Sequence, residues 1–198
     1  MRLPRASHAA APPSDPRPGV LPPEGVEPDD LRRALGRFAT GVTVVTSLET
    51  DRPRGVTVSA FMSVSLDPPL VLVALDQART LGPVIRATGA YAVNILGEDD
   101  AALSDCFAGA PSEPGRDVFC GAAWRPGALG MPILERAIAS LVCRLEDVVP
   151  VGDHHFLVGR VIAVSTGHGH ASPLLYYRRR YLRIERATTT PLEGLADH

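Results

Sequence analysis

The sequence lacks lysine altogether, so the 20 basic residues of this 198-residue chain are all arginine. With 22 acidic residues they give a formal net charge of -2. This near balance argues against nucleic acid or a membrane surface as a partner, because both select strongly basic patches. Without lysine there is also no P-loop, and any phosphate must be bound by arginine, hydroxyl groups and backbone N–H groups.

Cysteine is scarce as well. Cys106, Cys120 and Cys143 stand far apart, with no C-x-x-C spacing. Three thiols so spaced do not make a zinc site, and an odd, sparse set is typical of a reduced intracellular protein rather than a disulfide framework. We therefore expect all three to be small buried hydrophobic side chains in a cytoplasmic protein.

Several other signals are missing. No apolar run approaches the ~18 residues of a transmembrane helix, and the amino terminus lacks the apolar core of a signal peptide. There is no G-x-G-x-x-G turn for a dinucleotide and no G-x-S-x-G nucleophile elbow. His168 and His170, in GHGH, are too few to define a metal site, so we predict none.

The chain is expected to hold one domain between two loose ends. Residues 1–27 are rich in Pro and Ala without periodicity, which predicts a disordered extension. Residues 28–186 carry the ordered domain, and 187–198 form a flexible tail. A short helix should begin near Asp29 or Asp30 and stop at Gly41.

Alternating and β-branched segments dominate the rest of the domain. A turn is expected at Thr50–Gly55 and another at Val151–His154, and few helices interrupt the strands. The expected strands are 42–46, 55–60, 68–76, 90–97, 140–146, 154–167 and one near 175–185, and the expected helices are 80–89 (opened by Thr80, closed by Gly89) and 98–109. This order predicts a mainly β, antiparallel barrel with short peripheral helices rather than a parallel doubly wound sheet.

The stretch GVTVSAFMSVSLDPPL, from Gly55 to Leu70, mixes hydroxyls with apolar side chains. Ser59, Ser63 and Ser65 can turn donors toward an anion, while Ala60 lies against something flat and apolar. A flavin offers both surfaces, a ring and a phosphate. A serine-rich turn with a purely structural role is the alternative.

Other polar clusters leave alternatives open. His154, in VGDHHFLVGRV, is a structural histidine, a residue at the rim of a ligand site or, least favoured, a metal ligand. Asp99 and Asp100 precede a helix and suit its dipole better than they suit an acid–base pair. The run Arg178–Arg180 between tyrosines is either a phosphate contact or a charged turn.

Six segments, in this order, resemble the flavin reductase family with the FMN-binding split-barrel fold, and in particular the small reductase components of two-component flavin-dependent monooxygenases. They are FATGVTVVT, GVTVSAFMSVSLDPPLVLVAL, YAVNILG, LSDCFAG, GDHHFLVGRV and PLLYYRRRY. The resemblance covers residues 29–185.

The resemblance implies a cytoplasmic homodimer of antiparallel six-stranded Greek-key split barrels. It implies hydride transfer from NADH or NADPH to FMN or FAD, with the reduced flavin diffusing to a partner monooxygenase. No residue is expected to act as a general acid or base, because the hydride passes directly between the two rings. The alternative is a split-barrel protein that keeps its flavin, as an electron carrier or to reduce another substrate.

The resemblance also implies site residues. The nicotinamide nucleotide falls on Gly152, Asp153, His154 and Arg180. Arg179 stands where the family has glycine, and Asp117-Val118-Phe119 replaces D-K-F or D-R-F, which removes one cation near the phosphate. The implied flavin contacts are Thr40, Gly41, Val42, Thr57, Ser59, Ala60, Ser63, Ser65, Thr80, Asn94 and Phe107.

Overall fold

The structure is a computed structural model that describes residues 25–109, 119–167 and 172–184. The predictions for 1–24, Asp117, Val118, His168, His170 and the tail lie outside these ranges. The chain divides into two units, the first ending at Leu35 and the second starting at Gly36. In the first unit α1 spans Pro28–Leu35. It stops at Gly36, before the predicted end at Gly41, because glycine is a poor helix former.

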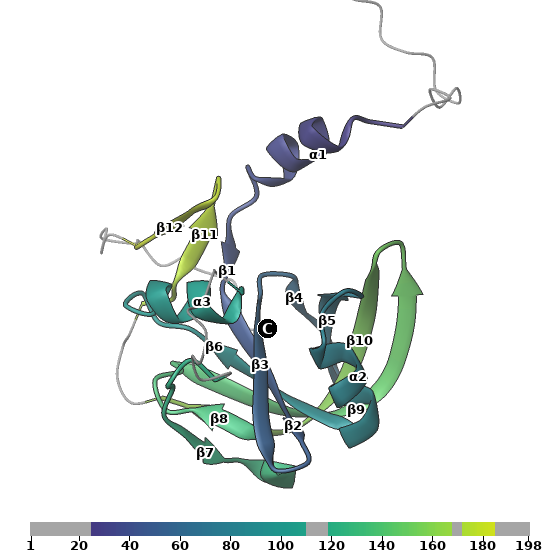
Figure 1. The fold of residues 1–198 in the computed structure, drawn as a ribbon, viewed down its shortest axis with the longest axis vertical. Helices are drawn as coiled ribbons and strands as arrows, with labels where there is room; N and C mark the ends of the chain where they lie inside the picture. The colour runs from purple at the N-terminus through teal and green to yellow at the C-terminus, as the bar shows by residue number, and fades with distance from the viewer. Residues whose placement is uncertain (1–24, 110–118, 168–171, 185–198) are drawn as a thin grey trace, which may run out of the picture. The chain divides into compact units, whose positions relative to one another are not determined.

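The second unit is mainly β, as predicted (Figure 1). It contains two α-helices, one short 3-10 helix and twelve strands within the described residues. The strands are β1 (Thr40–Gly41), β2 (Thr43–Glu49), β3 (Arg52–Val58), β4 (Phe61–Leu66), β5 (Pro69–Asp76), β6 (Ala90–Ile95), β7 (Trp124–Pro126), β8 (Pro132–Leu134), β9 (Ala139–Val151), β10 (His154–Thr166), β11 (Leu175–Tyr177) and β12 (Arg180–Leu182), and the helices are α2 (Leu81–Thr88), α3 (Ala101–Phe107) and η1 (Ala128–Gly130).

Seven antiparallel strands form the main sheet, in the order β3-β2-β6-β9-β10-β5-β4. The resemblance implied six strands in the barrel, whereas the main sheet has seven, because the segment Gly55–Leu70 supplies parts of two strands. β3 ends at Val58, and after Ser59 and Ala60 the chain starts β4, which pairs with β5 at the edge of the sheet. The serine-rich stretch is therefore an edge strand where a strand and loop were expected.

Turns and helices follow the local signals closely. α2 begins after Thr80 and closes on Gly89 in the left-handed conformation (φ 72°), as predicted. The long β9–β10 hairpin turns at Gly152–Asp153, inside the predicted turn. The β2–β3 turn is only Thr50–Asp51, shorter than predicted, because the strand pairing continues through Arg52 and Pro53.

The core packs tightly where β6, β9 and β10 meet. Tyr91 and Cys143 are fully buried, and Gly159 of β10 faces them. A Cβ at position 159 would lie 2.1 Å from the Tyr91 hydroxyl oxygen. Only glycine leaves room for this aromatic ring between the strands.

The expectation of three reduced, buried cysteines is wrong for two of them. Cys106 at the end of α3 and Cys120 form a disulfide, with Cα atoms 6.1 Å apart. Cys143 alone is free and buried, as predicted. A separation of 14 residues carries no pairing signal, because only the tertiary path brings the two cysteines within bonding range.

A small sheet in the order β1-β11-β12 stands beside the main sheet (Figure 1). Thr40 pairs with Tyr176, which joins the two ends of the domain. The β11–β12 turn consists of Arg178 and Arg179. No described helix is long and apolar enough to cross a membrane.

Candidate functional site

The end of β3 and the helix α3 are joined at the first group of predicted flavin contacts. The Thr57 hydroxyl donates to the Ser104 carbonyl oxygen over 2.6 Å. Phe107, buried at the other end of α3, lies directly against Gly55, where a Cβ would come within 2.7 Å of its ring. A side chain at position 55 would therefore displace Phe107, and the two predicted contacts Thr57 and Phe107 share one wall.

Thr40 carries a polar atom that the protein itself does not satisfy. Its Oγ1 is buried and has no hydrogen-bond partner among the described residues. A buried hydroxyl without a partner costs free energy, so such groups are rare in folded proteins. A polar ligand beside β1 would supply the missing partner, and a flavin with its hydroxylated side chain fits this requirement.

Gly41 and Val42, the next two predicted contacts, differ from Thr40 in the groups that a ligand can reach. Gly41 is exposed, and the space where its Cβ would lie is open for 4 Å. Val42 is in the core, and its carbonyl oxygen accepts from the Leu96 N–H. A ligand can approach the backbone at Gly41, whereas the side chain of Val42 is turned inward.

The serine segment presents its hydroxyls outward. Ser59, Ala60 and Ser63 are exposed, and Ser65 is half-buried. A β-bulge between Ser63 and Ser65 changes the direction in which β4 side chains point. The hydroxyls and the turn at Ser59 are thus free to meet a ligand, but they do not close a pocket by themselves.

Asn94 lies in the interior instead. Its Nδ2 donates to the Val44 carbonyl and the Thr46 hydroxyl, each over 3.1 Å. Its Oδ1 accepts from the Leu134 N–H and the Ser140 hydroxyl, each over 3.0 Å. All of its hydrogen-bonding capacity is used to join β2, β6, β8 and β9, so the structure does not bring it together with the other predicted contacts.

The loop between β5 and α2 links α3 to the β9–β10 hairpin. Thr80 is exposed at the start of α2 and makes no side-chain capping bond. The Arg79 guanidinium donates to the Ala108 carbonyl at the end of α3 over 3.1 Å. Gln77 donates from Nε2 to the carbonyl oxygens of Gly152 and His154, each over 3.2 Å. The sequence analysis missed Arg79 and Gln77 because nothing in their local pattern shows these distant partners.

Three of the four predicted nicotinamide contacts, Gly152, Asp153 and His154, lie at the tip of the β9–β10 hairpin. Gly152 is left-handed (φ 58°), and the Asp153 carbonyl accepts from the Gln77 N–H. His154 Nδ1 lies 2.6 Å from Asp153 Oδ1, and this contact holds the pKa of the Asp153 carboxyl below its ordinary value. The turn therefore presents an ionised carboxylate with an imidazole held beside it.

Arg180 is on the other hairpin, exposed in β12. The hydroxyl of the neighbouring Tyr181 donates to Asp105 Oδ1 over 2.6 Å, and its oxygen lies 2.9 Å from the Ser104 hydroxyl oxygen. Tyr181 is a third residue that the sequence analysis missed, and it connects the small sheet to α3. The structure shows no contact between Arg180 and the Gly152–His154 turn.

Asp99 and Asp100 are each paired with an arginine. Asp99 accepts from Arg183 and the buried Asp100 from Arg136, each over 2.6 Å. Among the described residues no three His, Cys, Asp or Glu side chains are grouped to hold a metal.

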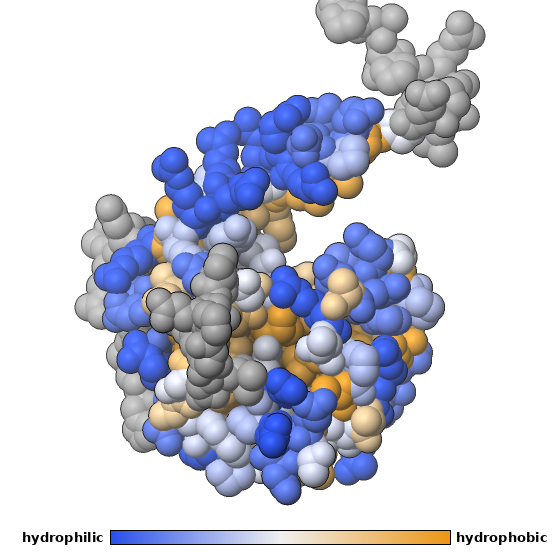
Figure 2. All heavy atoms as spheres, viewed as in Figure 1, coloured by the Kyte–Doolittle hydropathy of each residue, from blue (hydrophilic) through white to orange (hydrophobic). Residues whose placement is uncertain are grey.

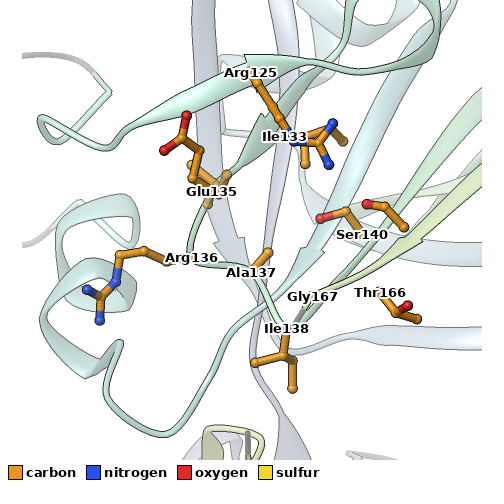
Figure 3. Close-up of a pocket in the computed structure, with 11 residues that line it drawn as sticks. Arg125, Ile133, Glu135, Arg136, Ala137, Ile138, Ser140, Thr166 and Gly167 are labelled. Carbon is orange, nitrogen blue, oxygen red and sulfur yellow. The ribbon is translucent and has the colours of Figure 1, made fainter. Parts of the chain in front are cut away.

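Two cavities lie outside the predicted site. One, of about 450 Å³, opens between β7, β8 and the adjoining ends of β9 and β10, with Arg125, Glu135, Ser140 and Thr166 around it (Figure 3). The other, of about 500 Å³, lies beside the disulfide. None of the predicted flavin or nicotinamide contacts lines either cavity. Figure 2 shows instead an exposed apolar area in the middle of the face formed by β3, β4 and α2.

Comparison with known proteins places this architecture in a family. The family model described as "Flavin reductase like domain" matches residues 35–185. An NADH-dependent flavin reductase from a Rhodococcus species is 45% identical over 170 residues, covering 84% of this chain and 92% of that protein. The reductase component of 4-hydroxyphenylacetate 3-monooxygenase from Thermus thermophilus is 41% identical over 154 residues, covering 78% and 95%.

Solved structures lead to the same family assignment. Nitrilotriacetate monooxygenase component B from Mycobacterium thermoresistibile superimposes with a TM-score of 0.78 at 38% identity, covering 85% of this chain and 93% of the other. An NADH:FAD oxidoreductase of Streptomyces globisporus in complex with NAD and FAD fragments gives a TM-score of 0.74 at 32% identity, covering 84% and 99%. This chain therefore belongs to the flavin reductase family.

Proposed function

We propose that this protein is an NADH-dependent flavin reductase that supplies reduced FMN or FAD to a partner monooxygenase. The observation that carries the proposal is the match to the flavin reductase domain over residues 35–185, nearly all of the second unit. Relatives that match most of their own length include reductase components of two-component monooxygenases.

We place the flavin along β1, the end of β3 and the α3 wall. The unpartnered Thr40 hydroxyl supports this position, as do the exposed hydroxyls of Ser59 and Ser63. Because the chain has no lysine, the flavin phosphate would be held by these hydroxyls, by backbone N–H groups and by arginine. The flavin itself, when bound, supplies the group that accepts the hydride.

The protein's part in the reaction is to position the two rings. Backbone N–H groups from Ser59 to Ser63 would stabilise the negative charge that grows on the flavin ring edge. The Asp153–His154 pair would orient the nicotinamide nucleotide, with Gln77 holding the turn in place. No proton transfer by a side chain is needed for this step, which agrees with the pairing of Asp99 and Asp100 to arginines.

We further propose that the sheet closes as a split barrel and that two copies pair as a homodimer in the cytoplasm. Met62, Val64 and Leu66 are exposed along the edge strand β4. An exposed apolar edge strand favours association with another chain, and a dimer would bury these side chains. Light scattering that gives a monomer would contradict the pairing.

The decisive experiment follows NADH oxidation by absorbance while FMN, FAD and riboflavin are added in turn. Turnover that saturates with added flavin supports a reductase that releases its flavin, and the three curves rank the flavins. Flavin binding without NADH oxidation would contradict the proposal and favour the electron-carrier alternative.

His154 gives the first testable prediction. His154→Ala should raise the KM for NADH by about tenfold, the loss of one oriented contact, and leave the flavin Kd within twofold. Steady-state kinetics and flavin fluorescence measure the two effects separately. His155→Ala, one residue along β10, is the matched control and should change neither value; an equal change in both variants would remove His154 from the nicotinamide site.

A further inference from the structure

The disulfide lies next to the proposed flavin wall. Cys106 directly precedes Phe107, and Cys120 directly follows Phe119. The rings of Phe107 and Phe119 pack edge to face, with centroids 5.2 Å apart. The covalent bond thus holds together two segments whose aromatic side chains form one cluster.

That cluster is connected to the flavin wall through α3. Phe107 lies against Gly55, and the Ser104 carbonyl accepts from Thr57. A shift of α3 by a fraction of an ångström would therefore reach both positions, because packed interiors transmit displacement rather than absorb it.

A small reagent can reach the pair. Cys106 and Cys120 are each half-buried, and both line the open cavity of about 500 Å³ together with Leu103, Gly121 and Ala122. Cys143 is different, since it is fully buried and its burial raises the pKa of the thiol to about 12. Thiol exchange needs both access and a thiolate, so the disulfide is open to it and Cys143 is not.

The backbone at Cys120 has a conformation that neighbouring contacts, the disulfide among them, must impose. Cys120 has φ 61° and Gly121 has φ 63°, two successive residues in the left-handed region. A side chain is disfavoured there, so the conformation persists only while neighbouring contacts impose it. The disulfide is one of the contacts that hold this turn against α3, beside the ring contacts of Phe119 with Phe107 and Trp124, so its loss weakens the connection between the two segments.

We propose that Cys106 and Cys120 form a reversible thiol–disulfide site that tunes flavin affinity, the oxidised form binding flavin more tightly. The inference rests on the proposed flavin site. Reduction takes two electrons from a dithiol. One thiolate of the dithiol attacks a sulfur of the pair, which breaks the S–S bond, releases one cysteine thiol and forms a mixed disulfide. The second thiol of the dithiol then attacks the mixed disulfide, releases the other cysteine thiol, and the dithiol leaves as a cyclic disulfide. Hydrogen peroxide, formed when free reduced flavin meets oxygen, reverses the step and yields two waters.

The test compares the full chain in two redox states. Peroxide-treated protein and protein reduced with dithiothreitol are each titrated with FMN, and binding is followed by quenching of flavin fluorescence. Both samples are treated with iodoacetamide under native conditions, and the number of alkylated thiols is read from the intact mass. We expect none in the peroxide-treated protein and two in the reduced protein. We expect the reduced form to bind FMN at least about fivefold more weakly, the lower end of ordinary coupling between two sites.

Coupling must also run in the opposite direction. Saturating FMN should shift the equilibrium between the disulfide and dithiothreitol toward the oxidised protein by the same factor. The double variant Cys106→Ser/Cys120→Ser should bind FMN like the reduced protein, with or without dithiothreitol. Cys143→Ala is the matched control and should keep the full redox response.

Three results would overturn the inference. Equal FMN affinity in both redox states would leave the flavin site intact but deny the coupling. Two alkylatable thiols after peroxide treatment would show that the pair does not form a bond. Absence of FMN binding by the fully oxidised protein would overturn the proposed flavin site as well, which separates that failure from the first two.

Discussion

At the residue scale, the buried hydroxyl of Thr40 is the most informative single atom of the site. It has no partner among the described residues, although most of the other buried hydroxyls of the sheet have one. Thr43, three residues away, donates to the Val58 carbonyl over 2.7 Å. The two threonines therefore form a matched pair, one satisfied by the protein and one left for a ligand.

This contrast leads to opposite predictions for the same substitution. Thr40→Val should leave the flavin-free protein equally stable or more stable by about 1 kcal/mol, because an unsatisfied hydroxyl is replaced by a methyl group, and should weaken flavin binding. Thr43→Val should destabilise the protein by about 1 kcal/mol, because a made hydrogen bond is lost. Thermal unfolding without flavin and an FMN titration measure both; a destabilised Thr40→Val that binds FMN normally would contradict the assignment.

Arg179 occupies a turn position whose backbone conformation favours glycine. Arg178 and Arg179 have φ 50° and 63°, the left-handed conformation that tight hairpin turns require and that glycine adopts without strain. Arg179→Gly should therefore stabilise the protein by about 1 kcal/mol in chemical denaturation. Arg180 lies within β12, so Arg180→Gly should instead destabilise the protein. If the two substitutions changed stability equally, the backbone conformation at position 179 would not be the cause.

At the scale of elements, the β9–β10 hairpin and β6 depend on one missing side chain. A Cβ on Gly159 would lie 2.1 Å from the Tyr91 hydroxyl oxygen and 2.9 Å from the Cys143 Cβ. Gly159→Ala should cost about 1–3 kcal/mol of unfolding free energy, the range for overpacking a tight core. Denaturation by urea measures the loss.

Two further variants identify the clash. Adding Tyr91→Phe to Gly159→Ala should recover part of the loss, because the nearest atom is then gone. Gly41→Ala, where no atom lies within 4 Å of the added Cβ, should leave stability unchanged. A double variant no more stable than Gly159→Ala alone would place the clash elsewhere.

At the scale of the whole molecule, the buried Tyr91–Cys143 pair makes stability depend on alkaline pH. Burial raises the pKa of the Cys143 thiol from 9.0 to about 12, and burial also raises the pKa of Tyr91. Both groups are neutral in the fold and ionise more readily in the unfolded chain. The stability of the fold is therefore unaffected by these groups below pH 9, and the free energy of unfolding decreases as pH rises toward 12.

We accordingly expect the melting temperature to fall steadily as pH rises above 9. Cys143→Ala and Tyr91→Phe should each show a shallower fall than the unchanged protein, whatever their stability at neutral pH. Calorimetry across this range provides the measurement, and identical slopes in all three proteins would mean that neither group is responsible.

Much of this protein followed from local patterns. The strands that became β2, β5, β6, β9 and β10, the helix α2 with its Gly89 stop and the Gly152–Asp153 turn were all predictable, because alternation, β-branching and turn residues act over a few positions. The six ordered segments also identified the family. The predicted end of α1 was wrong because Gly36 stops the helix earlier. The length of the β2–β3 turn and the number of strands differed because both depend on how far strand pairing extends. The expected reduced state of Cys106 and Cys120 was also wrong.

The sequence by itself determined the fold class, the family and the chemistry available for a flavin, since hydroxyls and arginines must replace the absent lysine. The tertiary structure alone decided which polar groups are already used. Asn94 and Thr40 look equally suitable in the sequence, yet one is satisfied within the core and the other is not. Likewise only the folded path joins Cys106 to Cys120 and Gln77 to the Gly152–His154 turn, because hydrogen bonds and disulfides depend on distances in space that sequence separation does not encode.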